Sequence, residues 1–131
     1  MNTDLLLKDS RLTYGDLTHQ IIGSAMDVIN SIGHGFPEKV YENSLVQDFL
    51  LKDIRVDQQR SFDIHYREKV VGTFIPDLII NDTIIVDTKC IEKITDRELG
   101  QMLNYLKITT LKIGLIMNFK RAKLEWERVI R

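Results

Sequence analysis

The spacing of apolar residues predicts three helices in this chain. From residue 17 to 32 the apolar positions recur every three or four residues, which is typical of an amphipathic helix. Two glycines, Gly33 and Gly35, then favour a turn. A second helix is predicted from Pro37 to about Lys52, and a third from an N-cap at Thr95 or Asp96 to about Lys107. The expected buried face of the third helix consists of Leu99, Met102, Leu103 and Leu106.

Alternating patterns predict the strands. Residues 56–66 alternate apolar and polar side chains, as in one strand with a solvated face. A short strand over residues 70–75 follows, and the last two strands are predicted over residues 112–118 and 123–130. Helices and strands in this order indicate an α/β or α+β fold with a mixed sheet.

The stretch from Asp77 to Lys89, DLIINDTIIVDTK, is predicted to form a β-hairpin. Its apolar residues fill consecutive positions, so both faces of these strands are expected to be covered, as in the centre of a sheet. Charged residues are rarely buried unless they are paired or bind a metal. Asp77, Asp87 and Lys89 at the strand ends are therefore the first candidate site.

The length of the hairpin loop decides whether the two acids meet. With a three-residue loop over 81–83, Ile80 pairs with Ile84 and Asp77 lies opposite Asp87. A two-residue loop would turn the acids to opposite faces, because side chains alternate along a strand. A metal site needs the three-residue loop, or a bulge near Pro76. In either case Asp87 and Lys89 share a face.

Length and composition fit one soluble domain spanning 1–131, with residues 1–12 as a loose lead-in. The formal charge of −1 gives no overall basic signature, so nucleic-acid binding would depend on a local patch. The single cysteine, Cys90, excludes an internal disulfide. No stretch reaches transmembrane length, so we expect no membrane association and a cytoplasmic location.

Two close carboxylates with a lysine two residues later suit metal-assisted phosphodiester hydrolysis. The acids would hold Mg²⁺ or Mn²⁺ through oxygen atoms, and the metal would polarise the phosphoryl oxygen and activate water. Lys89, on the same face as Asp87, would orient that water or stabilise negative charge. The alternative is an exposed Asp-x-Lys ion pair on a strand end, which would contribute little to stability.

Three motifs resemble the PD-(D/E)xK nuclease superfamily. Pro76-Asp77, nine residues and then Asp87-Thr88-Lys89 match its core pattern. Gly35-Phe36-Pro37-Glu38-Lys39-Val40-Tyr41 matches the signature of the GxxExxY family, and Gln101-Met102-Leu103-Asn104-Tyr105 is similar to the Gln-x-x-x-Tyr motif of the RecB-like branch. The resemblance covers about residues 17–129 and implies a restriction-endonuclease-like core, with a central mixed sheet flanked by helices.

The resemblance also implies roles for individual residues. Asp77 and Asp87 would bind metal, Glu38 would complete the metal site, and Lys89 would be the catalytic lysine. Gln101 and Tyr105 would support the site or contact substrate. Many small relatives act as dimers, so a homodimer is a further expectation.

Several other residues have competing interpretations. Glu38 is equally compatible with a first-turn acid and with an acid that leans towards the hairpin, whereas Glu42 is interpreted mainly as a first-turn acid. Cys90 is expected to be a small core residue. The basic residues Lys120, Arg121, Lys123 and Arg128 are better explained by a solvated strand edge than by phosphate contacts.

Two functional hypotheses follow. The first is a Mg²⁺- or Mn²⁺-dependent nuclease, acting on DNA rather than RNA. The second is a catalytically silent nuclease-fold module that binds nucleic acid or a protein partner. The small size of the chain and its near-neutral charge favour the second, and the acid, acid and lysine set favours the first.

Overall fold

The computed structural model describes residues 14–131, and the predicted lead-in over residues 1–12 lies outside them. The elements, in chain order, are α2 (Tyr14–Ile32), α3 (Glu38–Leu51), β1 (Val56–Gln58), β2 (Phe62–Tyr66), β3 (Lys69–Phe74), β4 (Leu78–Ile80), β5 (Ile84–Lys89), α4 (Asp96–Thr109), β6 (Ile113–Asn118) and β7 (Glu125–Ile130). The predicted helices are thus all present. Within the described residues, no helix is long and apolar enough to cross a membrane.

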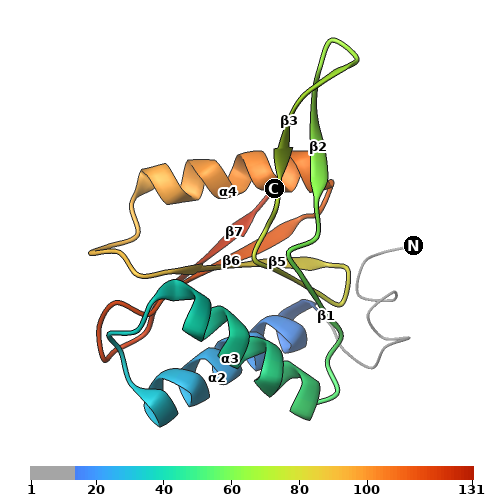
Figure 1. The fold of residues 1–131 in the computed structure, drawn as a ribbon. Helices are drawn as coiled ribbons and strands as arrows, with labels where there is room; N and C mark the ends of the chain where they lie inside the picture. The colour runs from blue at the N-terminus through green and yellow to red at the C-terminus, as the bar shows by residue number, and fades with distance from the viewer. Residues whose placement is uncertain (1–13) are drawn as a thin grey trace.

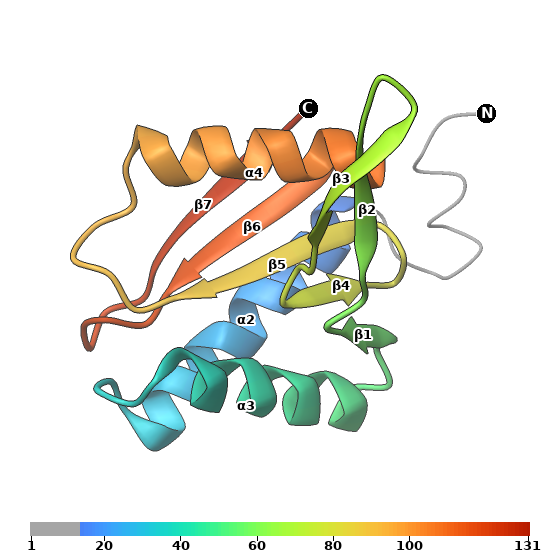
Figure 2. The ribbon, with the colours of Figure 1, turned by 45° about the horizontal axis from the view of Figure 1, so that its top comes forward.

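The core of the fold is a five-stranded mixed sheet between two layers of helices. The strand order is β1-β4-β5-β6-β7, and only β5 and β6 run parallel. Helices α2 and α3 lie on one face, and α4 covers the other (Figures 1 and 2). Because α4 connects the parallel strands β5 and β6, it must cross the sheet between their opposite ends. The mixed α+β fold expected from the sequence is confirmed.

Local sequence signals explain where the helices begin and end. Thr95 caps α4 through a capping box with Glu98, in which the Thr95 hydroxyl accepts from Arg97 N–H. At the far end of α2, Gly33 has a φ of +82°, a left-handed conformation that suits glycine and stops the helix. On α4, Met102 and Leu106 are buried as predicted, but Leu103 is 40% exposed, so its assignment to the buried face was wrong.

The hairpin adopts the register that brings the acids together. Ile80 pairs with Ile84 and Leu78 with Val86, around a loop of residues 81–83. Asn81 and Asp82 both have positive φ, which short polar side chains tolerate well. Every residue of β4 is buried, as expected for a central strand. Of the two loop lengths that the sequence allowed, the structure has the three-residue loop that a metal site requires.

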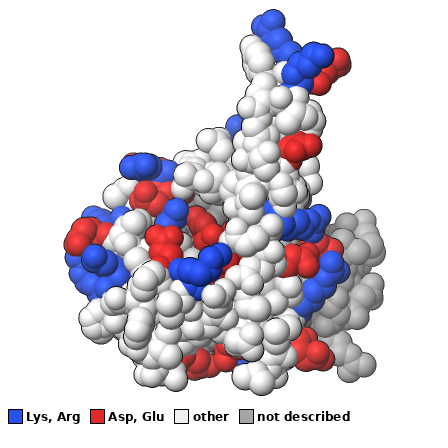
Figure 3. All heavy atoms as spheres, viewed as in Figure 1, with Lys and Arg blue, Asp and Glu red and all other residues white. Residues whose placement is uncertain are grey.

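The single strand predicted over residues 56–66 is wrong, because the chain leaves the sheet midway. Gln59 has a φ of +59°, and its N–H donates to the carbonyl of Asp77 at 3.1 Å. This turn ends β1 and sends β2 away to pair with β3 in a separate two-stranded ribbon. The ribbon projects from the body of the molecule and carries charged side chains at its tip (Figure 3).

Candidate active site

Asp77 and Asp87 form a half-buried carboxylate pair at one end of the hairpin. Continuing the β4–β5 register by one residue places them opposite each other. Asp77 is fixed by Thr88, whose backbone N–H and hydroxyl both donate to Asp77 Oδ2 at 2.9 Å. Thr88 is itself buried, so it holds Asp77 in place from within the core. The adjacent Asp87 side chain is 15% exposed.

The electrostatics of this pair penalise a second negative charge. Burial raises the pKa of Asp87 most, and the neighbouring charge of Asp77 raises it further, to about 7 against an ordinary 3.8. The Lys89 ammonium opposes this shift but does not cancel it. When two carboxylates share a site, one of them keeps its proton to a higher pH than usual. A cation bound between the two carboxylates would favour their ionised forms.

Lys89 supplies part of that positive charge. Its Nζ lies 3.2 Å from Asp87 Oδ2, and the two side chains come from the same face of β5, as predicted. Burial works to lower the pKa of Lys89, but the charges of Asp87 and Glu38 outweigh it and raise the pKa. Lys89 therefore remains an ammonium at neutral pH. It is suited to stabilising negative charge and is unsuited to acting as a base.

Glu38 approaches the same strand end from α3 but does not join the acid pair. Its Oε2 accepts a hydrogen bond from the backbone N–H of Cys90 at 3.3 Å, and its charge reaches Lys89. Glu38 is both the first-turn acid of α3 and directed towards the hairpin, so its two interpretations describe one position. Cys90 is half-buried and packs against the α2–α3 side of the core.

Tyr41 holds the loop that presents Glu38. Its ring is fully buried and stacks on Phe119 with centroids 4.5 Å apart. Its hydroxyl donates to the carbonyl of Gly33 at 2.8 Å and accepts from the backbone N–H of Phe36 at 3.2 Å. One phenol thus ties both ends of the connection between α2 and α3, immediately before Glu38.

Replacing Tyr41 with phenylalanine is expected to destabilise the protein by about 1–3 kcal/mol. The ring stack would survive, but a carbonyl and an N–H would lose their partner beside the core. Urea denaturation of the two proteins measures this difference. Tyr14→Phe, at the start of α2, is the matched control and should change the stability little. Equal stability of wild type and Tyr41→Phe would show that the hydroxyl does not hold the loop.

Glu42 has a structural role that the first-turn interpretation missed. It is 3% exposed and accepts hydrogen bonds through Oε2 from Lys39, Gln58 and Gln59, at 3.1, 2.6 and 2.9 Å. Gln59 is also the residue whose N–H bonds Asp77 at the exit from β1. Glu42 therefore anchors the turn that runs alongside Asp77.

Tyr105 lies beside the acid pair, whereas Gln101 makes no polar contact with it in the described residues. Burial raises the pKa of Tyr105, and the charge of Asp87 adds to the effect. The Tyr105 ring stacks on Phe74 of the ribbon at 3.8 Å between centroids. Tyr105 thus contacts the ribbon from α4 and lies within electrostatic reach of Asp87, Lys89 and Asp77. Gln101 is half-buried one turn earlier on the helix.

The donor set fits a divalent cation at the acid pair. Mg²⁺ and Mn²⁺ bind oxygen atoms, and Mg²⁺ commonly uses one or two carboxylates while keeping several waters. Asp77 and Asp87 provide two such groups, and burial together with the charge of Asp77 raises the pKa of Asp87, so a bound cation would lower the cost of ionising it. Over residues 14–131 no three or more His, Cys, Asp or Glu side chains are grouped to hold a metal. Glu38 is accordingly not part of a preformed three-acid set.

Three comparisons with known proteins bear on this site. Residues 15–129 match the family model described as "PD-(D/E)XK nuclease superfamily". A comparison with curated proteins finds no match. Among solved structures, the chain is similar to the protein of "Crystal structure of SSO0001", with a TM-score of 0.57 and 13% identity. That match covers 90% of this chain and 57% of the other, and at this identity it shows a shared fold.

Proposed function

Because the chain belongs to the PD-(D/E)XK nuclease superfamily, we propose that it is a metal-dependent nuclease that hydrolyses phosphodiester bonds, with DNA as its substrate. The observation that carries the proposal is the hairpin register, which sets Asp77 opposite Asp87 with Lys89 Nζ 3.2 Å from the second acid. Within the superfamily, the motifs around Glu38 and Gln101 support placement in the GxxExxY group and the RecB-like branch. A homodimer remains a prediction from the resemblance alone.

In this mechanism Asp77 and Asp87 would hold Mg²⁺ or Mn²⁺, and Glu38, whose charge acts on Lys89, would be the additional acid. A bound divalent cation supplies a Lewis acid that polarises the phosphoryl oxygen and lowers the pKa of bound water. Lys89, an ammonium at neutral pH, places its charge where negative charge grows on the phosphoryl oxygens. Thr88 keeps Asp77 oriented throughout, because both of its donors are aimed at Asp77 Oδ2.

The assignment is tested by incubating the purified protein with single- and double-stranded DNA, and with RNA, in Mg²⁺ or Mn²⁺. We expect cleavage of DNA that EDTA stops. The Asp87→Ala, Lys89→Ala double variant should lose at least about 10³-fold in rate, because it removes a metal ligand and the compensating cation. The control is Asp53→Asn with Lys112→Ala, two exposed positions at the opposite end of the sheet. Undiminished cleavage by the first variant would refute the proposed site.

A second candidate function is a silent module that binds nucleic acid or a protein partner. It is favoured by Glu38, which bonds the Cys90 N–H instead of joining the two aspartates. This module would cut none of the substrates with either metal. Cleavage that depends on Asp87 and Lys89 would eliminate it.

A further inference from the structure

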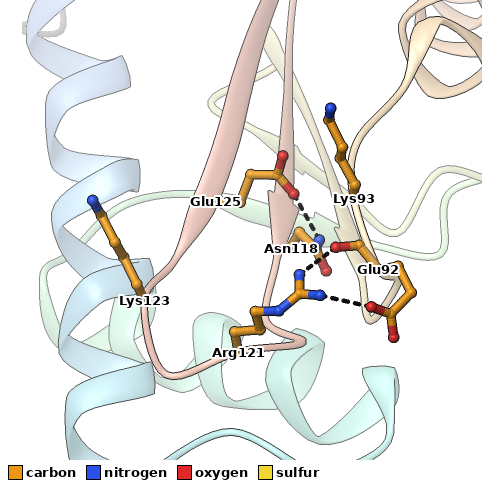
Figure 4. A pocket seen from close by; sticks show the side chains of 6 residues that line it. All are labelled: Glu92, Lys93, Asn118, Arg121, Lys123 and Glu125. Carbon is orange, nitrogen blue, oxygen red and sulfur yellow. Dashed lines mark hydrogen bonds and ion pairs between the residues drawn. The ribbon is translucent and has the colours of Figure 1, made fainter.

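A pocket of about 340 Å³ lies at the carboxyl ends of β5 and β6, next to the candidate active site. It is formed by two loops, residues 90–95 after β5 and residues 119–124 after β6. Figure 4 shows its six lining side chains, which are Glu92, Lys93, Asn118, Arg121, Lys123 and Glu125. Carboxyl ends of adjacent parallel strands are a common position for ligand sites in open α/β sheets.

The floor of this pocket is rigid. Asn118 is 2% exposed, and its amide donates to Ile91 O at 2.9 Å and to Glu125 Oε1 at 2.8 Å. Its carbonyl oxygen accepts from Ile91 N–H at 3.0 Å, and Glu125 Oε1 also accepts from Ile94 N–H at 3.1 Å. These bonds tie the loop of residues 90–95 to the end of β6 and the start of β7. The acid of Glu125 is therefore committed to the loop backbone.

The rim of the pocket carries positive charge. Arg121 is 62% exposed and bonds Glu92 through both the side chain and the carbonyl of that residue. Glu92 is 77% exposed, so this ion pair is weak and can exchange for another anion. Lys93 and Lys123 are exposed and have no ion pair or hydrogen bond elsewhere in residues 14–131. The Arg121 guanidinium donates through one nitrogen to the Glu92 carboxylate and through the other to the Glu92 backbone carbonyl, and the same pair of donors can bind two oxygens of a phosphate.

The pocket is close enough to the acid pair to share one substrate strand with it. Asn118 pairs with Lys89 across the β5–β6 ladder, and Phe119 N–H donates to Lys89 O at 2.8 Å. Neighbouring strands are roughly 4.8 Å apart, and phosphates of one DNA strand follow at roughly 3.4 Å along the helix axis. A nucleic-acid strand with its scissile phosphate at Lys89 would therefore pass the pocket within a few nucleotides.

We propose that Lys93, Arg121 and Lys123 form a second phosphate site, which binds the backbone of the substrate strand beside the scissile bond. The inference rests on the proposed nuclease function and names how that site would hold its substrate. Arg128, which the sequence grouped with these residues, is not part of it, because its side chain lines a different pocket beside α2. Arg121 and Lys123 are exposed, as the solvated-edge interpretation expects, and the phosphate site would add a function to these exposed side chains.

The test is DNA binding in EDTA, where cleavage cannot occur, by fluorescence anisotropy of a labelled 16-nucleotide strand over a series of salt concentrations. The Lys93→Ala, Lys123→Ala variant should bind about 10-fold more weakly at low salt. The slope of log K against log salt should fall by about 1.4, since each lost phosphate contact to a single strand lowers it by about 0.7. Lys107→Ala with Lys112→Ala removes the same charge at the far end of β6 and is expected to bind like wild type.

A second measurement separates this inference from the function on which it rests. In Mn²⁺, Lys93→Ala, Lys123→Ala should raise KM with kcat unchanged, because the lost contacts lie away from the reacting atoms. Wild-type cleavage together with unchanged KM, affinity and salt slope in this variant would overturn the phosphate site and leave the nuclease proposal standing. A wild-type protein that neither binds nor cuts DNA would overturn both. If the Lys107→Ala, Lys112→Ala control lost as much DNA affinity as Lys93→Ala, Lys123→Ala, the phosphate site would also be overturned, because binding would then depend on net charge alone.

Discussion

Metal-free Asp87→Asn is expected to be more stable than the wild-type protein at pH 8. The folded protein holds the Asp87 carboxyl at a pKa of about 7, against 3.8 as an ordinary value. Between these two values the unfolded chain has released its proton while the folded protein keeps it. Asp87 therefore lowers the free energy of unfolding progressively as pH rises through this window, and this cost is greatest above pH 7. Asparagine is neutral and removes that cost.

The size of the effect follows from the shift. About three pKa units correspond to roughly 4 kcal/mol at most. Part of this gain is offset in Asp87→Asn, because Lys89 Nζ loses the ion pair with Asp87 Oδ2 at 3.2 Å. We expect a net gain of about 1–3 kcal/mol at pH 8, or roughly 3–10 °C in Tm, and little gain at pH 4.

Thermal melts in EDTA at both pH values measure the gain. Asp53→Asn, an exposed carboxylate at the other end of the sheet, is the control and should follow wild type. An Asp87→Asn protein no more stable than wild type at pH 8 would mean that ionised Asp87 does not destabilise the folded protein.

Adding Mn²⁺ is expected to offset that difference in stability. Mn²⁺ at 100 times its Kd should stabilise the wild-type protein by about 2.7 kcal/mol, because it binds the folded state alone. Asp77→Asn and Asp87→Asn should lose at least about 100-fold in affinity, since each removes one of the two carboxylates at the site. Melts with and without Mn²⁺ would then show a gain for wild type and Asp53→Asn only. A similar gain in all four proteins would place the metal elsewhere.

The central hairpin could be predicted from sequence because its determinants are local. Alternation fixes which residues share a face, and the loop of residues 81–83 fixes the register, so Asp77, Asp87 and Lys89 follow from short-range geometry. The capping box at Thr95 is equally local. Such features lie within a few residues of each other, and the pattern contains what is needed to place them.

The errors arose where partners are distant in sequence. Glu42 is buried because Gln58 and Gln59, 16 and 17 residues away, donate to it. The turn at Gln59 is stabilised by Asp77, which no alternation of residues 56–66 reveals. Leu103 follows the helical period of α4 but falls at the margin of the covered face, at 40% exposure. In each case tertiary contacts determined the structure, and the local sequence pattern did not contain them.

The basic residues of the 119–124 loop show the same limit. In sequence they read as charges near an edge strand, because the opposing loop at residues 90–95 is some 29 positions away from Arg121. Only the fold brings Glu92, Lys93 and Arg121 to one pocket. The phosphate site beside the acid pair is therefore a property of the topology.

Calorimetric titration of the wild-type protein and Asp77→Asn with Mn²⁺ tests the acid pair most directly. The asparagine side chain would keep an oxygen to accept the Thr88 hydrogen bonds, so the variant should fold while losing a carboxylate. We predict one binding event in wild type and in Asp53→Asn, and none in Asp77→Asn over the same concentrations. Equal binding by Asp77→Asn, or no binding by wild type at millimolar Mn²⁺, would contradict a metal site between Asp77 and Asp87.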